Sequence, residues 1–380
     1  MTHLTATLDE VCEFIVDCLH ATAPTQETGY PLIRTPNIGK GRLSLEKAYR
    51  VSDETYQKWT RRAVPEPGDL ILAREAPAGN IALVQPGQEV CLGQRTVHLR
   101  LDKKKVDPAF LCYYLLSPSQ QAALLAGETG ATAKHVNMKD IRRLPLVNLP
   151  HLDVQVKVGE MLAGYDDLIE NNQRRIQLLE ESARLLYKEW FVHLRFPGHE
   201  HVKVTNGVPE GWEPLPLGDL ITLQRGFDLP VSKRVEGEVP IYASTGITGY
   251  HAEAKVSGPG VVTGRSGSLG HVMYVSDDYW PLNTTLWIKD FKKIKPHFAR
   301  HLLANLHLEQ YNGGAAVPTL NRNDVHRIQA LFPPSMLLSL FEEQALDLYR
   351  QVDVLTKTNE RLAKARDLLL PKLMSGELAA

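Results

Sequence analysis

The chain has 380 residues, of which 43% are hydrophobic and 23% charged, a composition typical of a folded protein with two or three domains. Its formal net charge is −1, which excludes an overall basic surface, so any nucleic-acid contact has to come from local basic clusters. The four cysteines form no CxxC pair, and neither a signal peptide nor a membrane-spanning apolar run is visible, so we expect a cytoplasmic chain with reduced thiols and no membrane partner.

Short elements in the first 150 residues recur later in the chain. The matching pairs are 74–84 with 265–275, 106–110 with 294–298, 130–137 with 314–321, and 143–146 with 327–333. The first pair predicts a strand, a glycine-containing turn and a strand in each copy, and the second opens an apolar helix. The pairs keep one order while their offset falls from 191 to 184, as loop insertions would cause, so they predict an internal duplication. The first copy has a longer opening section, since residues 31–33 pair best with residues 240–242.

Residues 151–195 predict one long amphipathic helix. Apolar residues recur at three-and-four spacing from Val158 to Leu168 and from Ile176 to Trp190, with Asn172 at a position of the apolar seam. The stretch from Asp153 to Trp190 would form a rod of roughly 57 Å, the length of roughly 16 base pairs of DNA.

Residues 336–380 predict a second long helix after the second copy, residues 196–335. Its apolar seam runs from Phe341 to Leu373, and Asn359 takes one seam position. One seam asparagine in each helix is typical of a coiled coil in which it fixes the register. We favour antiparallel pairing over two helices packed separately on their own domains, because both stretches exceed the usual helix length.

The predicted fold class is therefore α/β (α+β). Two tandem mixed α/β domains, residues 1–150 and 196–335, are separated by two long helices that pair as an antiparallel coiled coil. The internal duplication makes this arrangement pseudo-two-fold.

Several segments resemble those of one known family, the type I restriction-modification specificity subunits. Residues 184–200 resemble the central conserved region of that family, and residues 366–378 resemble its distal conserved region. Residues 211–220 resemble the usual opening of its second target-recognition domain, and residues 264–270 with 281–286 resemble the middle of that domain. The resemblance covers essentially the whole chain, although residues 74–79 lack the first glycine of the motif.

This resemblance implies a non-catalytic subunit that reads a bipartite asymmetric sequence in double-stranded DNA, one half per domain. Its helices would act as a spacer and as the docking surface for two methylation subunits, and restriction/translocase subunits would complete the complex. No cofactor is expected on this chain, whereas S-adenosylmethionine, ATP and Mg are expected on the partner subunits.

The glycine-rich turn of the second copy carries one group of candidate DNA contacts. Arg265, Ser266 and Ser268 lie where a backbone can approach a phosphate closely, and Arg74 opens the matching turn of the first copy. A plain hairpin turn with glycines at positive φ is the alternative interpretation.

Polar residues around the starts of two short predicted helices form the next group. They are Lys134, His135, Asn137 and Lys139 in the first copy, and Thr319, Asn321, Arg322 and Asn323 in the second. Asn137 and Asn321 also fit helix N-caps with an acid at N3. A helix start can also hold a phosphate, so the two interpretations are compatible.

Basic clusters form the last group. Arg61 and Arg62 lie close to Lys58, and lysines around 103–105 and 292–295 fall just before the repeated helix. Solvated loops are the alternative interpretation for each of these clusters. The histidines, such as His297 and His301, are expected to be incidental, and no metal site is predicted.

Two other classes of protein remain as alternatives. A self-contained DNA-modifying enzyme would need a methyltransferase motif or a Walker A loop. Residues 332–334 have prolines in the wrong context, and residues 258–265 lack the Walker spacing and lysine, so no catalytic residue is predicted. A coiled-coil scaffold without DNA binding is the second alternative, and the duplicated globular domains argue against it.

Overall fold

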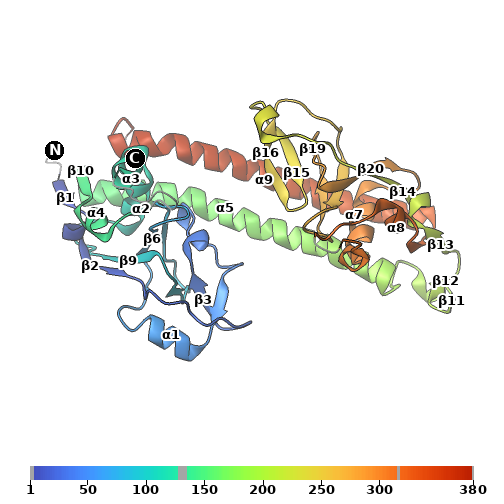
Figure 1. Ribbon diagram of the computed structural model, residues 1–380, viewed down its shortest axis with the longest axis horizontal. Coiled ribbons are helices and arrows are strands. Elements are labelled where there is room, and N and C mark those ends of the chain that lie inside the picture. The colour runs from blue at the N-terminus through green and yellow to red at the C-terminus, as the bar shows by residue number, and fades with distance from the viewer. Residues whose placement is uncertain (1–3, 127–134, 315–316, 379–380) are drawn as a thin grey trace. The chain divides into compact units, whose positions relative to one another are not determined.

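The computed structural model describes residues 4–126, 135–314 and 317–378, which form two compact units (Figure 1). Unit 1 comprises Met1–Gln173 and Lys357–Ala380, and unit 2 comprises Arg174–Thr356. Each unit combines mixed α/β structure with one part of each of two long helices, α5 (Leu152–Tyr187) and α9 (Ser335–Ser375). The mixed α/β fold and the two long helices agree with the sequence prediction.

The strands of unit 1 form a five-stranded sheet, a three-stranded sheet and a separate pair. They are β1 (Leu4–Thr7), β2 (Cys12–Asp17), β3 (Tyr30–Ile33), β4 (Gly41–Arg42), β5 (Tyr49–Val51), β6 (Leu70–Ala73), β7 (Ile81–Leu83), β8 (Cys91–Leu92), β9 (Thr96–Leu101) and β10 (Pro145–Leu149). The larger sheet has the order β2-β9-β6-β7-β4, the smaller one β5-β3-β8, and β1 pairs with β10. All four residues of β6 are buried, as expected for a central strand that is covered on both faces.

The shorter helices of unit 1 are α1 (Asp53–Trp59), α2 (Pro108–Leu116), α3 (Pro118–Leu125) and α4 (Met138–Arg143). Helix α2 begins where Asp107 caps it, because the Asp107 carboxylate accepts a hydrogen bond of 2.8 Å from the backbone N–H of Phe110. The core joins Phe110 to Val158 of α5 and Leu370 of α9, so both long helices contribute to the core of unit 1.

Unit 2 repeats this construction. Its strands are β11 (Val204–Thr205), β12 (Val208–Pro209), β13 (Glu213–Pro216), β14 (Ile221–Arg225), β15 (Val239–Ala243), β16 (Gly246–His251), β17 (Gly260–Gly264), β18 (Val272–Val275), β19 (Trp280–Pro281), β20 (Thr285–Phe291) and β21 (Gln329–Phe332). Its shorter helices are α6 (Leu217–Leu220), α7 (Pro296–Asn305) and α8 (Arg322–His326). The ring centroids of Phe191 and Phe298 lie 4.9 Å apart, and those of Phe191 and Phe341 lie 5.2 Å apart, at the centre of its core.

The sheets of the two units share one strand order, which confirms the internal duplication. The order β14-β20-β17-β18 in unit 2 matches β2-β9-β6-β7 in unit 1, and β16-β15-β19 matches β5-β3-β8. In both small sheets the middle strand has one antiparallel and one parallel neighbour. Residues 31–33 and 240–242 lie in the equivalent strands β3 and β15, as the sequence predicted.

Helices α5 and α9 run antiparallel within unit 1. The side-chain amide of Asn172 donates a 2.9 Å hydrogen bond to the amide oxygen of Asn359, and Arg366 pairs with Asp166 one to two turns away. Asn359 also donates to the backbone carbonyl of Ile169 at 3.3 Å. In unit 2 the ring of Tyr187 from α5 lies 6.0 Å from the ring of Phe341 from α9.

Of the helices in the described ranges, none has the length and apolar character needed to cross a bilayer.

Candidate nucleic-acid interface

The glycine-rich loop after β17 lies against the segment that precedes α8. The backbone N–H of Leu320 donates to the carbonyl of Arg265 at 2.8 Å, and Ser266 forms a β-bridge with Thr319. The N–H of Gly267 donates to the carbonyl of Pro318 at 3.0 Å. We call residues 265–271 together with residues 317–323 the second loop pair. Candidate contacts from two separate sequence motifs therefore lie side by side.

The second loop pair presents polar groups to the surface. Ser268, Asn321, Arg322 and Asn323 are exposed, while Arg265 is half-buried, and its guanidinium donates to the carbonyl of Asn283 at 3.4 Å. The predicted N-cap is present, since the Asn321 side chain accepts a 3.0 Å hydrogen bond from the backbone N–H of Asn323. Guanidinium, amide and hydroxyl groups can bond both phosphate oxygens and base edges.

Unit 1 contains the equivalent pair of loops. The backbone N–H of Val136 donates to the carbonyl of Arg74 at 2.9 Å, as Leu320 does to Arg265 in unit 2. We call residues 74–80 together with residues 135–139 the first loop pair. Gly79 has a φ of +88° and its counterpart Gly270 a φ of +81°, so the glycine-dependent part of the turn is retained although the first motif glycine is missing.

The remaining candidates of the first loop pair lie just before α4 and in its first turn. Asn137 occupies the N-cap position, and its amide donates to the Asp140 carboxylate at 3.3 Å. His135 is half-buried and Lys139 is exposed, whereas Lys134 lies outside the described residues.

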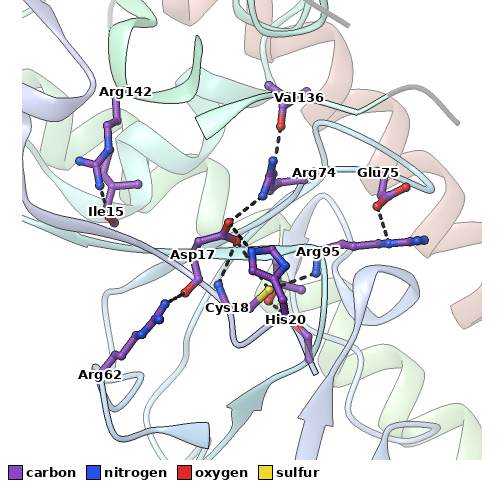
Figure 2. A network of polar contacts seen from close by, with 12 residues as sticks. Ile15, Asp17, Cys18, His20, Arg62, Arg74, Glu75, Arg95, Val136 and Arg142 are labelled. Carbon is purple, nitrogen blue, oxygen red and sulfur yellow. Dashed lines mark hydrogen bonds and ion pairs between the residues drawn. The ribbon is translucent and has the colours of Figure 1, made fainter. Parts of the chain in front are cut away.

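The side chain of Arg74 is held by a polar network around Asp17 (Figure 2). Its Nη1 donates to Asp17 Oδ2 at 2.7 Å, and its Nε donates to the carbonyl of Val136 at 3.0 Å. The Asp17 carboxylate also contacts His20 Nε2 at 3.1 Å and accepts from the backbone N–H of Cys18 at 3.0 Å. Figure 2 shows Arg62 approaching from the other side, where it donates to the Asp17 carbonyl at 3.4 Å.

A hollow of about 320 Å³ adjoins this network. Its lining joins strand β2 and the end of α1: Val16, Asp17, Cys18, Leu19, Lys58, Trp59, Arg61, Arg62, Ala63, Leu92 and His98. Arg61 and Arg62 are exposed, and the Lys58 ammonium lies 5.6 Å from the centre of the Trp59 ring. The hollow thus combines three cations with an aromatic ring, a combination that suits nucleic acid.

A buried hydrogen-bonded cluster around Asp69 lies beside the hollow, which His98 helps to line. His98 Nε2 lies 2.6 Å from Asp69 Oδ2, and Arg100 donates to both oxygens of the same carboxylate. Burial raises the pKa of Asp69, but the hydrogen bonds from His98 and Arg100 outweigh this effect and lower it to about 2. The carboxylate therefore stays ionised and fixes both basic side chains.

Sequence reasoning missed Asp17, His20 and Asp69. Asp17 lies at the end of a strand without a recognisable motif, and it meets Arg74 only because β2 and β6 both pair with β9. The duplicated position of Arg74 was the one sequence signal for this network, since it identified the loop that contains Arg74 but not the acidic partner of Arg74.

The other basic clusters make contacts away from the loop pairs. Lys105 donates to the carbonyl of Glu10 at 2.9 Å, Lys292 donates to the carbonyl of Gly218, and Lys293 lies over the ring of Phe332. Among the described residues, no group of three or more His, Cys, Asp or Glu side chains is placed to hold a metal ion. His297 instead pairs with Glu342 at 2.7 Å in the core of unit 2.

Comparisons with known proteins identify the family. The model of the type I restriction modification DNA specificity domain matches residues 5–181 and 209–337. The specificity subunit of the type I restriction enzyme MjaIX from Methanocaldococcus jannaschii is 25% identical over 361 residues, covering 86% of this chain and 81% of that protein. The HindI specificity subunit from Haemophilus influenzae is 22% identical over 360 residues, covering 71% of this chain and 77% of the relative.

A solved structure shares the fold. The crystal structure of a type I restriction-modification S subunit from M. genitalium superposes with a TM-score of 0.58 at 17% identity, covering 98% of this chain and 96% of that one. The two matches to the specificity domain fall on the two halves of the duplication and together span most of the chain. The chain therefore belongs to the type I restriction-modification DNA specificity family, and it is a non-catalytic specificity subunit of such a system.

Proposed function

We propose that this subunit reads a bipartite, asymmetric sequence in double-stranded DNA, with residues 1–150 reading one half and residues 196–335 the other. The observation that carries the proposal is the repeated loop pair: two sheets of equal strand order each place an arginine-led turn against the segment before a short helix. Because the two loop pairs differ in side chains, the two half-sites are expected to differ in sequence.

The proposed DNA contacts are the polar side chains of the two loop pairs and of the hollow. They are Arg61, Arg62, Arg74, His135, Asn137 and Lys139 in the first domain, and Arg265, Ser266, Ser268, Thr319, Asn321, Arg322 and Asn323 in the second. Surface cations give affinity through phosphates, whereas side chains that are fixed in position can discriminate bases.

The long helices, residues 151–195 and 336–380, are proposed to act as the spacer and as the docking surface for two methylation subunits. Exposed leucines support a docking role, since Leu168 of α5 is 52% exposed and Leu368 of α9 is 70% exposed. The hydrogen-bonded pair Asn172–Asn359 is proposed to fix the register of the two helices.

The remaining partners follow from the family. Restriction/translocase subunits would join the complex, S-adenosylmethionine, ATP and Mg would be bound by the partner subunits, and the assembly would act in the cytoplasm, where it meets DNA.

The test is to co-express the chain with its methylation subunit and to map N6-methyladenine across the host genome. We expect one motif with two specified halves and an unspecified gap. Replacing residues 1–150 with the first domain of another specificity subunit should change one half only. The matched replacement of residues 196–335 should change the other half.

Two outcomes would contradict the proposal. Methylation that does not depend on this chain would favour a scaffold without DNA binding. A continuous motif, or a motif in which both halves change with one replacement, would exclude the assignment of one half-site to each domain.

A further inference from the structure

Asp17 and Arg225 occupy the same position in the two repeats. Asp17 ends β2 opposite Val97, and Arg225 ends β14 opposite Leu286, next to the equivalent threonines Thr96 and Thr285. In each repeat the following N–H donates to that threonine's carbonyl, at 3.2 Å from Cys18 and 3.1 Å from Gly226. One strand position beside the loop pair therefore carries an acid in the first domain and a base in the second.

The acid fixes Arg74 in the first domain. Two of the three guanidinium nitrogens are engaged, Nη1 by Asp17 Oδ2 at 2.7 Å and Nε by the carbonyl of Val136 at 3.0 Å (Figure 2). The side chains of Asp17 and Arg74 are only 19% and 16% exposed, so the pair is largely shielded from solvent. Within the described part of the chain, the third nitrogen, Nη2, makes no hydrogen bond or ion pair.

Among the described residues of the second domain, no acidic side chain pairs with the loop arginine, Arg265. Arg265 donates to a backbone carbonyl, that of Asn283, at 3.4 Å, and Arg225 pairs with Asp228 at 3.5 Å on the exposed surface. An acid thus neutralises the loop arginine in one domain, and the loop arginine keeps its charge in the other.

We propose that Arg74 reads a guanine of the first half-site and that Asp17 is the positioning residue that aims it. This inference rests on the proposed function. An arginine held at two points has already lost most of its rotamer entropy, so its remaining N–H donors can discriminate a base edge. Arginine most often reads guanine, whose O6 and N7 both accept in the major groove.

The net charge of the Asp17–Arg74 pair distinguishes base reading by Arg74 from a phosphate contact. Asp17 cancels the charge of Arg74, so the pair attracts a phosphate weakly. The exposed Arg61 and Arg62 beside it have no acidic partner among the residues that the structure describes. The neighbouring hollow thus supplies affinity for the backbone, and the Asp17–Arg74 pair supplies the choice of base.

The test compares Asp17→Asn, Arg74→Gln and the control Arg62→Gln in the complete complex with its methylation subunit. Two readouts are needed: the genomic N6-methyladenine motif, and the salt dependence of binding to a target duplex and to a random duplex. In the wild type we expect at least one G·C pair in the half-site that is assigned to residues 1–150.

Each variant has its own expected result. Arg74→Gln and Asp17→Asn should both relax that G·C position, with a loss of discrimination of about 10- to 100-fold, and leave the second half-site unchanged. Asp17→Asn should in addition bind random duplex more tightly, with a salt slope steeper by about 0.9, because it releases the charge of Arg74. Arg62→Gln should keep the motif and make the slope shallower by about 0.9.

The inference is overturned if the first half-site contains no G·C pair, or if Asp17→Asn lowers methylation at every site without altering the motif. An unchanged second half-site shows that each variant is folded. A bipartite motif that follows the domain replacement but ignores both variants would reject this inference and leave the proposed function standing.

Discussion

Gly159 shows how one residue decides a helix contact. It lies in α5 beside the start of α2, and a Cβ at this position would lie 2.6 Å from Asp107 Oδ1 and 2.7 Å from the backbone nitrogen of Phe110. These two atoms are the acceptor and the donor of the 2.8 Å capping hydrogen bond of α2, so a Cβ at position 159 would disturb that bond.

We expect Gly159→Ala to destabilise the protein. Alanine favours a helix over glycine by about 1 kcal/mol, but overpacking typically costs about 1–3 kcal/mol and a lost N-cap about 1 kcal/mol more. Urea denaturation, followed by circular dichroism, should show a lower midpoint. Gly164→Ala is the matched control, since that site in the same helix has open space, and its midpoint should rise. Equal shifts of the urea midpoint in the two variants would show that the atoms around Gly159 leave room for a Cβ.

At the scale of elements, helix α7 is joined to α9 by buried aromatic and polar contacts within unit 2. The Tyr349 hydroxyl lies 3.2 Å from His301 Nε2, and the rings of His297 and Tyr349 stack at 4.9 Å. Burial, assisted by the nearby charge of Arg300, lowers the pKa of His301 from 6.5 to about 3. His301 is therefore neutral in the folded protein at neutral pH.

This shift predicts the direction of a pH effect on stability. Between about pH 6.5 and 3 the unfolded chain holds a proton on His301 that the folded chain lacks, so the free energy of unfolding falls as the pH falls. The fall approaches about 1.4 kcal/mol for each pH unit inside that window. Urea titrations at pH 7, 6 and 5 should show that the free energy of unfolding depends less steeply on pH in His301→Gln than in the wild type. The exposed His307 provides the control variant His307→Gln, and a slope for His301→Gln equal to that of the control would contradict this origin.

The elements were predictable to different degrees. Helix α2 agrees with the apolar helix predicted to open at residues 106–110, β7 agrees with the strand predicted after the glycine-containing turn, and the repeat located the loop pairs. The strand order was not predictable, because it depends on long-range pairing that local sequence does not encode. For the same reason the partner of Arg74 could not be named, since Asp17 is 57 residues away and reaches it through the sheet.

At the scale of the whole molecule, the duplication extends into the long helices. Asn172 and Asn359 each take one seam position in the helix that follows their repeat, and they hydrogen-bond to each other within unit 1. Because the two domains share one strand order and one loop pair each, each is expected to contact its half-site with the same loops.

This duplication predicts the result of exchanging the two domains. Residues 4–149 and 213–332 begin and end at equivalent strands, β1 with β10 and β13 with β21, so they can be interchanged at matched boundaries. Each half-site would then be read by the same domain from the opposite end of the spacer. Because the duplex can be turned end for end, the exchanged chain should methylate the same bipartite motif with the same gap. Mapping N6-methyladenine in cells that carry only the exchanged chain measures this directly.

The control is a chain with residues 4–149 in both places, which should methylate a palindromic motif made of two copies of the first half-site. A new motif from the exchanged chain, or a gap of different length, would show that the two repeats do not meet DNA in equivalent ways. In that case the two domain positions along the helical spacer would not be interchangeable, and the duplication would apply only to the fold of each domain.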